Sequence, residues 1–365
     1  MRRSHLILLP IAGLAAAGTL AACGGGDPAD DGEINVVAAF YPLAYAAEQV
    51  GAGNVTVTNL TPAGQEPHDL ELAPSDIAAI EEADYVVYLK DFIPELDAAV
   101  EQYAPDKSLD VATAVETLGY DDTEVFEDDH AAEEHADDHA HEEGEEHAHE
   151  EGEEHAHEDE HAEETHADET ASEDERAEEE GHDHSHDELE GTDPHIWLDP
   201  TRYAQIGTAV ADGLAGVDDA NADDYTAAAE DFAADLAALD AEFTDALAAR
   251  SSDAVVTSHA AFGYLADRYG LHQVAISGLS PDQEPDTQRM AEVAEYIETN
   301  GVTTIFFETL VSPDIAETLA AETGADTAVL NPLEGLTDEE LDADADYFTV
   351  MRENLAALQT ALGAA

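Results

Sequence analysis

The sequence predicts an α/β protein of two lobes, each with a central sheet, bridged by one long rigid helix. Three observations lead to this fold class. From Glu33 onward, short apolar runs alternate with amphipathic stretches, which is the pattern of α/β domains. The stretch 221–250 keeps one apolar helical face and contains neither glycine nor proline. A second alternating series of elements follows it, so we expect one lobe on each side of this helix.

The elements of the first half follow from these patterns. We expect strands at 34–40, 55–60, 85–89 and 109–112, and helices from Pro42, at 75–83, at 94–103 and from Thr201. Ser75 is a suitable cap for the second helix, with Asp76 in its first turn, because a helix N-terminus favours oxygen acceptors and negative charge.

The predicted bridging helix has six large apolar residues on one face: Tyr225, Phe232, Leu236, Leu239, Phe243 and Leu247. At ~1.5 Å per residue the whole stretch would be about 43 Å long. That length fits a connector better than a packing helix inside one lobe. A break near Asp240 remains the alternative.

The second half of the chain shows the same alternation of predicted strands and helices as the first. We expect strands at 254–257, 274–276, 302–307 and 327–330, and helices at 261–269, 287–300, 313–323 and 347–362. Gly270, Gly301 and Gly324 stand where helix C-termini need a left-handed residue. The expected domains are therefore 33–220, the bridging helix 221–250, and 251–365.

The N-terminus predicts export. Arg2 and Arg3 precede an apolar run from Leu6 to Leu20 that is too short for a stable membrane span, so 1–22 reads as a signal peptide. Leu20-Ala21-Ala22-Cys23 resembles the lipobox of bacterial lipoproteins, in which the cysteine is lipidated. We expect Cys23 to tether the chain to the outer face of the cytoplasmic membrane, with 23–32 as a linker.

The net charge of the chain limits which binding partners are expected. The formal net charge is −78, of which the stretch 121–193 contributes −35 and the remainder −43. Acidity is thus a property of the whole surface, and it excludes nucleic acid as a partner because phosphates would be repelled. Our hypothesis is adaptation to a salty exterior, where screening keeps a carboxylated surface soluble.

A histidine-rich stretch suggests a metal. Thirteen of the eighteen histidines lie between His130 and His186, nearly all beside Glu or Asp, and the unit HAHEEGEE repeats. With almost no large apolar residue, 121–192 is expected to be a disordered loop. Dense imidazole and carboxylate suit a borderline divalent ion, zinc first. A solvated acidic spacer is the plainer alternative.

Four histidines remain outside the loop and the signal peptide: His68, His195, His259 and His272. His68 and His259 follow predicted strands, as does Glu334, and ligands bind beyond the carboxyl ends of strands in open sheets. We therefore expect His68, His195, His259 and Glu334 to meet in the cleft between the lobes as a four-coordinate zinc shell. His272 lies in a predicted strand without such a context.

Three segments carry a family resemblance. Gly64–Glu71 (GQEPHDLE), Asp193–Pro200 (DPHIWLDP) and Ser258–Tyr264 (SHAAFGY) resemble the metal-binding segments of zinc-uptake ABC transporter solute-binding proteins, the cluster A-I group. The resemblance covers Ile34 to the C-terminus. It implies two α/β lobes bridged by a long helix, a histidine-rich loop between the first two ligand segments, and His68, His195 and His259 as the imidazole ligands.

The resemblance also bears on the fourth ligand and on the metal. Many members have Asp shortly after the last strand, where this chain has Asn331. The run Asn331–Thr337 (NPLEGLT) instead resembles streptococcal-type zinc lipoproteins, which implies Glu334, with water or an Asn331 oxygen as the alternative. Manganese members tend to have Glu in place of His259, so histidine favours zinc. Glu308 is a candidate partner for a ligand imidazole, or equally a simple surface or helix-N-terminal carboxylate.

The expected function is a monomeric, high-affinity Zn²⁺ receptor that passes its ion to an ABC permease and its ATPase. Manganese or another divalent ion, and a surface zinc buffer or adhesin that uses the loop alone, are the alternatives. A zinc hydrolase would need an open coordination position and a general base. Glu334 would close that position and no HExxH motif is present, so we do not expect an enzyme.

Overall fold

The computed structural model describes residues 34–119 and 192–364. Within them the chain forms two compact units, and both are discontinuous in sequence. Of the described residues, unit 1 contains 34–116, Asp199–Phe243 and Leu333–Arg352, and unit 2 contains 117–119, 192–198, Thr244–Pro332 and 353–364. The expected signal peptide, the linker, Cys23 and nearly all of the histidine-rich loop lie outside the described residues.

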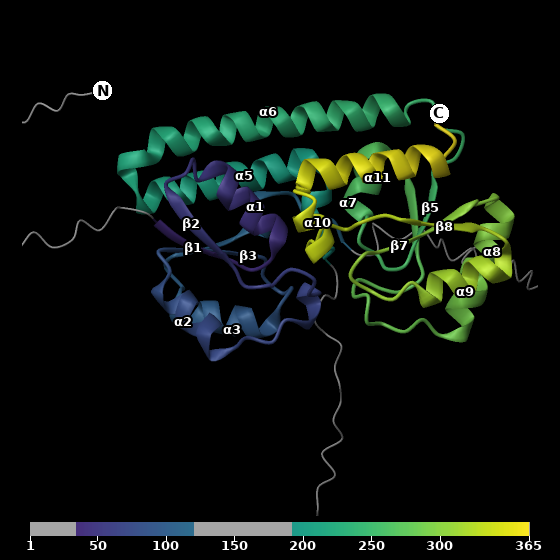
Figure 1. Ribbon diagram of the computed structural model, residues 1–365, viewed down its shortest axis with the longest axis horizontal. Coiled ribbons are helices and arrows are strands. Elements are labelled where there is room, and N and C mark those ends of the chain that lie inside the picture. The colour runs from purple at the N-terminus through teal and green to yellow at the C-terminus, as the bar shows by residue number, and fades with distance from the viewer. Residues whose placement is uncertain (1–33, 120–191, 365) are drawn as a thin grey trace, which may run out of the picture. The chain divides into compact units, whose positions relative to one another are not determined.

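Unit 1 is built on a four-stranded parallel sheet. Its strands are β1 (Ile34–Ala38), β2 (Val55–Asn59), β3 (Tyr85–Tyr88) and β4 (Ser108–Asp110), in the order β2-β1-β3-β4. Helices α1 (Tyr41–Val50) and α5 (Pro200–Val217) lie on one face, and α2 (Pro74–Glu82) and α3 (Pro94–Tyr103) on the other (Figure 1). Because both faces are covered, β1 ends in consecutive buried residues rather than an alternating pattern.

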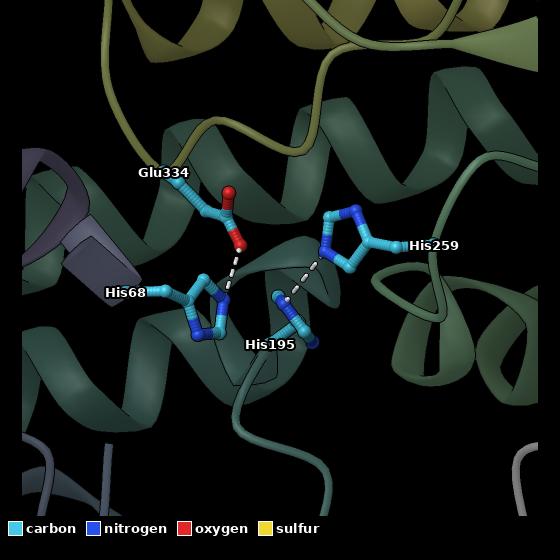
Figure 2. A group of neighbouring side chains, drawn as sticks. All are labelled: His68, His195, His259 and Glu334. Carbon is cyan, nitrogen blue, oxygen red and sulfur yellow. Dashed lines mark hydrogen bonds and ion pairs between the residues drawn. The ribbon is translucent and has the colours of Figure 1, made fainter. Parts of the chain in front are cut away.

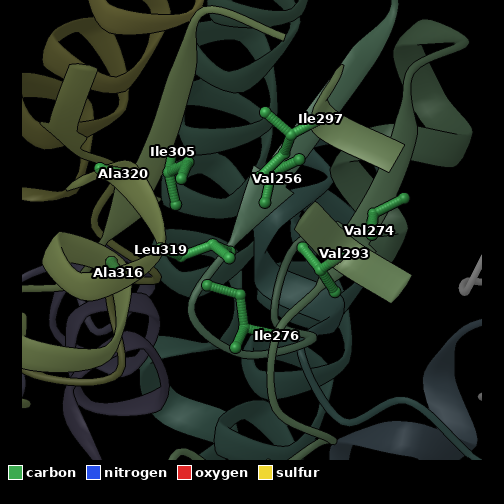
Figure 3. Close-up of a cluster of buried hydrophobic side chains, with 9 residues drawn as sticks. All are labelled: Val256, Val274, Ile276, Val293, Ile297, Ile305, Ala316, Leu319 and Ala320. Atoms are coloured by element: carbon green, nitrogen blue, oxygen red, sulfur yellow. The ribbon is translucent and has the colours of Figure 1, made fainter. Parts of the chain in front are cut away.

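Unit 2 repeats this topology. The parallel strands β5 (Ala254–Thr257), β6 (His272–Ala275), β7 (Thr304–Phe307) and β8 (Asp326–Val329) have the order β6-β5-β7-β8. Helix α7 (Gly263–Tyr269) packs against β6, and α8 (Thr287–Asn300) and α9 (Asp314–Thr323) supply side chains to an apolar cluster with the sheet (Figure 3). This cluster consists of Val256, Val274, Ile276, Val293, Ile297, Ile305, Ala316, Leu319 and Ala320.

The long helix predicted at 221–250 is α6 (Ala222–Leu247), a continuous helix without a break at Asp240. Its 26 residues correspond to about 39 Å. All six residues of the predicted apolar face are buried. Helix α6 begins in unit 1 and its last turn belongs to unit 2, so it joins the two sheet-bearing units along the chain. The predicted fold class, two α/β lobes with central sheets joined by one long helix, is confirmed, and the structure shows that both sheets are parallel.

Most other elements were predicted to within a few residues, including α11 (Tyr347–Ala361), which also contributes to both units. Gly270, Gly301 and Gly324 end α7, α8 and α9 with φ of 64°, 65° and 78°, as expected. None of the helices in the described part of the chain combines the length and apolarity required to cross a membrane.

Two local predictions were wrong. Ser75 does not cap α2, because the helix already begins at Pro74 and the Asp76 carboxylate accepts the Ala73 N–H at 2.8 Å. The strand expected at 109–112 ends at Asp110, because the Asp110 side chain accepts the Ala112 N–H at 3.1 Å and starts a 3₁₀ turn, Val111–Ala114. In both cases an aspartate carboxylate accepts a backbone N–H, and this hydrogen bond sets the end of the element in place of the apolar pattern.

Candidate metal centre

His68 lies in the loop after β2, on a 3₁₀ turn formed by Pro67–Asp69. The turn is held by Glu66, whose carboxylate accepts the His68 N–H at 3.2 Å. The His68 ring packs edge-on against Phe92, with the ring centroids 4.5 Å apart. The backbone and one face of the ring are therefore supported before any metal binds.

Glu334 is the partner of His68 within unit 1. Its Oε1 lies 3.2 Å from His68 Nε2, although 266 residues separate the two in sequence. The two loops are tied together where the Gly64 N–H donates to the Leu336 carbonyl at 2.9 Å. Leu333, just before Glu334, has a φ of 59°, a left-handed conformation that is costly for a bulky side chain. Strain of this kind concentrates at ligand sites, where the surrounding structure maintains it.

His195 is fully buried in unit 2 and is held by the residue two positions before it. Asp193 Oδ1 accepts the His195 backbone N–H at 2.9 Å and lies 2.8 Å from His195 Nδ1. The following turn is anchored by Trp197, whose Nε1 donates to the Pro332 carbonyl at 2.7 Å. The ring is thereby oriented with Nδ1 towards Asp193.

His259 follows β5 and is also fully buried in unit 2. The Thr257 hydroxyl donates to its carbonyl at 2.7 Å, which fixes the turn after the strand. Glu308, directly after β7, lies with Oε1 2.6 Å from His259 Nδ1, a close contact rather than a well-aligned hydrogen bond. On the other side of the ring, Nε2 lies 3.4 Å from Nε2 of His195.

The predicted ligands therefore form two pairs, His68 with Glu334 and His195 with His259, whose contacts are the dashed lines in Figure 2. Two ligand atoms about 2.0–2.1 Å from a tetrahedral zinc ion lie about 3.3–3.4 Å apart. The separations of 3.2 Å and 3.4 Å each match one edge of such a tetrahedron. Each pair thus has the chemistry and the spacing of half a zinc site.

The sequence also drew attention to residues near the four proposed ligands. His272 is exposed at the start of β6. The backbone of Asn331 exchanges two hydrogen bonds with the Asn354 side chain, at 2.8 and 2.7 Å, and it is Glu334 that contacts His68. Glu308 does contact a ligand imidazole. Asp193 was not singled out, although its place two residues before a candidate ligand was a usable signal.

The comparisons with known proteins agree with this chemistry. Residues 36–361 match the family model described as "Zinc-uptake complex component A periplasmic". The high-affinity zinc uptake system protein ZnuA of Bacillus subtilis is 32% identical over 354 residues, 96% of this chain and 93% of that protein. The zinc-binding protein AdcA of Streptococcus pyogenes is 32% identical over 335 residues, 90% of this chain. These cover only 56% of AdcA, so the chain spans little more than half the length of such relatives.

Two solved structures are also similar. The crystal structure of the Zn(II)-bound ZnuA-like domain of Streptococcus pneumoniae AdcA has a TM-score of 0.64 and 29% identity, covering 91% of this chain and 99% of that domain. The laminin-binding protein Lmb of Streptococcus agalactiae, described as an adhesin with metal-transporting activity, has a TM-score of 0.64 over 90% of this chain and 99% of its own. At 24% identity, the likeness to Lmb shows the fold alone.

Proposed function

The chain belongs to the family of periplasmic zinc-uptake components, and on that premise we propose that it is a high-affinity receptor that captures Zn²⁺ outside the cytoplasmic membrane. The family is one of solute-binding components rather than enzymes. In this function zinc is the transported substrate, which the receptor must bind tightly and then release to an ABC permease and its ATPase.

One observation carries the proposal: each of the two ligand pairs is spaced as an edge of a zinc tetrahedron. We propose that His68, His195, His259 and Glu334 together ligate a single ion. They are the group of His and carboxylate side chains, among the described residues, that is able to hold one metal ion. Three neutral imidazoles and one carboxylate leave a net charge of +1 on the bound ion.

The ligand chemistry favours zinc over manganese. Imidazole nitrogen suits zinc, whereas manganese prefers carboxylate, carbonyl and water oxygens. Three of the four proposed ligands are nitrogen, and one of them is His259, where manganese members tend to have an oxygen ligand. The same full shell argues against hydrolysis, because a catalytic zinc keeps a position for water.

We propose lipidation of Cys23 as the means of keeping the receptor at the membrane, beside the permease that accepts its ion. Lipoprotein relatives support this, among them the zinc-binding lipoprotein AdcA of Streptococcus pneumoniae, 33% identical over 363 residues. The receptor would act as a monomer, since the ligand set comes from one chain. The histidine-rich stretch would concentrate cations and hold further zinc ions more weakly.

A zinc titration that separates tight from weak binding tests the proposal. Full-length protein is compared with a variant that lacks His130 to His186 and with the triple variant His68→Ala, His195→Ala, His259→Ala. The deletion leaves Asp193 and Pro194 in place. It also leaves in place the contact between the segments on either side of the stretch, in which the Asp193 N–H donates to the Leu118 carbonyl at 3.0 Å.

We expect the deletion to lose several weak zinc equivalents and to keep one tight equivalent, because the two pairs do not draw on that stretch. The triple variant should lose the tight equivalent and keep the weak ones. A deletion variant without the tight equivalent would contradict the proposed division of roles. A triple variant that still binds one zinc tightly would instead indicate a buffer that uses the histidine-rich stretch alone.

A further inference from the structure

Two buried carboxylates, Asp193 and Glu308, belong to neither ligand pair, yet each contacts a ligand imidazole. Their side chains are among the most completely buried acidic groups of unit 2, with exposed fractions of 0% and 3%. Burying a carboxylate is costly unless it is paired and hydrogen-bonded. The second oxygen of each, Asp193 Oδ2 and Glu308 Oε2, is buried without a hydrogen-bond partner among the described residues. Packing alone does not account for two such groups.

Strand register explains why Glu308 reaches His259. The parallel strands β5 and β7 are neighbours, with Thr257 opposite Phe306. His259 and Glu308 follow two residues after this pair, just beyond the strand ends, and they remain close, with the His259 backbone N 3.3 Å from Glu308 Oε1. This edge, between the two strands where the sheet order reverses, is the position at which open α/β sheets bind ligands.

Three neighbouring groups contact the same oxygen of Glu308. Oε1 accepts the Ser258 hydroxyl, lies 3.3 Å from the His259 backbone N–H, and lies 2.6 Å from His259 Nδ1. Because this carboxylate is negative and can only accept hydrogen bonds, its charge beside Nδ1 stabilises the proton of a neutral His259 ring on that nitrogen. Asp193 has the same effect on His195 through its contact of 2.8 Å with Nδ1.

These tautomers determine which atoms of His195 and His259 face each other. If both rings carry their proton on Nδ1, both Nε2 atoms present a lone pair, and these two atoms are 3.4 Å apart. Two lone pairs that face each other repel unless a cation lies between them. A neutral pair without the carboxylates would relax instead, by moving one proton to Nε2 and forming a His–His hydrogen bond.

We propose that Glu308 and Asp193 are positioning residues that keep Nε2 of His259 and His195 unprotonated and aimed at the zinc ion. They do not ligate the metal. They remove the competing His–His hydrogen bond and supply negative charge behind the ligands, which strengthens imidazole as a donor. This inference rests on the proposed function for the identity of the ion, but the ring tautomers that it requires can be measured in metal-free protein.

The test uses full-length protein with Glu308→Gln, Asp193→Asn and, as matched control, Glu322→Gln, which neutralises an exposed carboxylate of α9 in the same unit. Glutamine and asparagine keep the shape of each side chain. Their amide NH₂ can also donate to Nδ1, which stabilises the wrong tautomer. Two quantities are measured: the affinity of the tight zinc equivalent by chelator competition, and the histidine ¹⁵N signals of metal-free protein, assigned with His259→Gln and His195→Gln.

We expect Glu308→Gln and Asp193→Asn each to weaken tight zinc binding about 10- to 100-fold, the usual range for such partners, and Glu322→Gln to leave it unchanged. In the metal-free protein, the Nε2 signal of the affected histidine should shift from an unprotonated towards a protonated value. A purely structural role would lower the melting temperature without that shift.

The inference is overturned if both variants keep the wild-type zinc affinity and ring signals. Wild-type protein without a tight zinc equivalent would refute the proposed function, and the ring signals would still decide the positioning role. Should Glu308→Gln fail to fold, Asp193→Asn makes the same measurement on His195.

Discussion

Asp97, in the first turn of α3, is a residue whose environment opposes its charge. Its Oδ2 accepts the Asp91 N–H at 2.8 Å. The pKa of the Asp97 carboxyl is raised from 3.8 to about 6, mainly by burial. The hydrogen bond from the Asp91 N–H partly offsets this rise, and the nearby Asp91 charge adds to it. Because the folded pKa is the higher one, Asp97 favours folding below about pH 4, and this contribution is lost as the pH rises through about 6.

We therefore predict that Asp97→Asn stabilises the protein at pH 7. Asparagine keeps an oxygen for the Asp91 N–H and removes the partly desolvated charge. After allowance for solvent screening of this half-exposed group, the gain should be about 1 kcal/mol in the free energy of unfolding. Denaturant unfolding at pH 7 and at pH 4 measures it, with the exposed Asp106→Asn as control. An equal gain at both pH values would show that charge is not the cause.

At the scale of elements, helix α5 packs against β3 of the unit 1 sheet, and a glycine of α5 lies at this contact. A Cβ at Gly213 would overlap the hydroxyl of Tyr85. Desolvation, with a smaller effect of the Asp212 charge, raises the pKa of Tyr85 to about 12, so the hydroxyl is neutral and enclosed. A side chain at position 213 would have to displace a packed ring.

Gly213→Ala should therefore destabilise the protein by about 1–3 kcal/mol, although alanine favours a helix by about 1 kcal/mol. Gly216→Ala, three residues along the same helix, meets no atom within 4 Å and should be neutral or stabilising. Adding Tyr85→Phe should recover part of the loss, because it removes the hydroxyl, the nearest of three overlapping Tyr85 atoms, and leaves the two ring carbons. Thermal unfolding of wild type, Gly213→Ala, Tyr85→Phe and the double variant forms the cycle, and additive effects in it would contradict the predicted contact.

At the scale of the whole molecule, the dominant physical fact is the net charge of −78. Self-repulsion of this size destabilises a compact state, and salt screens it over about 10 Å at 0.1 M and about 3 Å at 1 M. The charge is spread over the chain and is not confined to the histidine-rich stretch. The hypothesis of a salty exterior follows from this distribution.

We predict that the melting temperature at pH 7 rises from 0.05 M to about 2 M KCl, because screening reduces the repulsion between carboxylates. At a pH near the pI of about 4.1, where the net charge is small, the salt dependence should nearly disappear. A melting temperature that is constant or falls with salt at pH 7 would count against the hypothesis.

Local pattern was sufficient for the elements and for much of the candidate site. The alternation of apolar runs predicted both parallel sheets, and the apolar face of 221–250 predicted α6, because both patterns record which side of an element is buried. Polar residues at strand ends, together with the resemblance of three short segments to a family, indicated the histidines. All of these signals lie within a few residues of the feature that they predict.

Only the tertiary structure decided the features that depend on strand register and on strain. It packed 333–352 with unit 1, set Leu333 in a left-handed conformation, and brought Glu334 to His68 across 266 residues. It also placed Glu308 against His259, 49 residues away, because β5 and β7 are neighbours with a particular register. Pairing between distant segments depends on the packing of the whole chain, which no local pattern encodes.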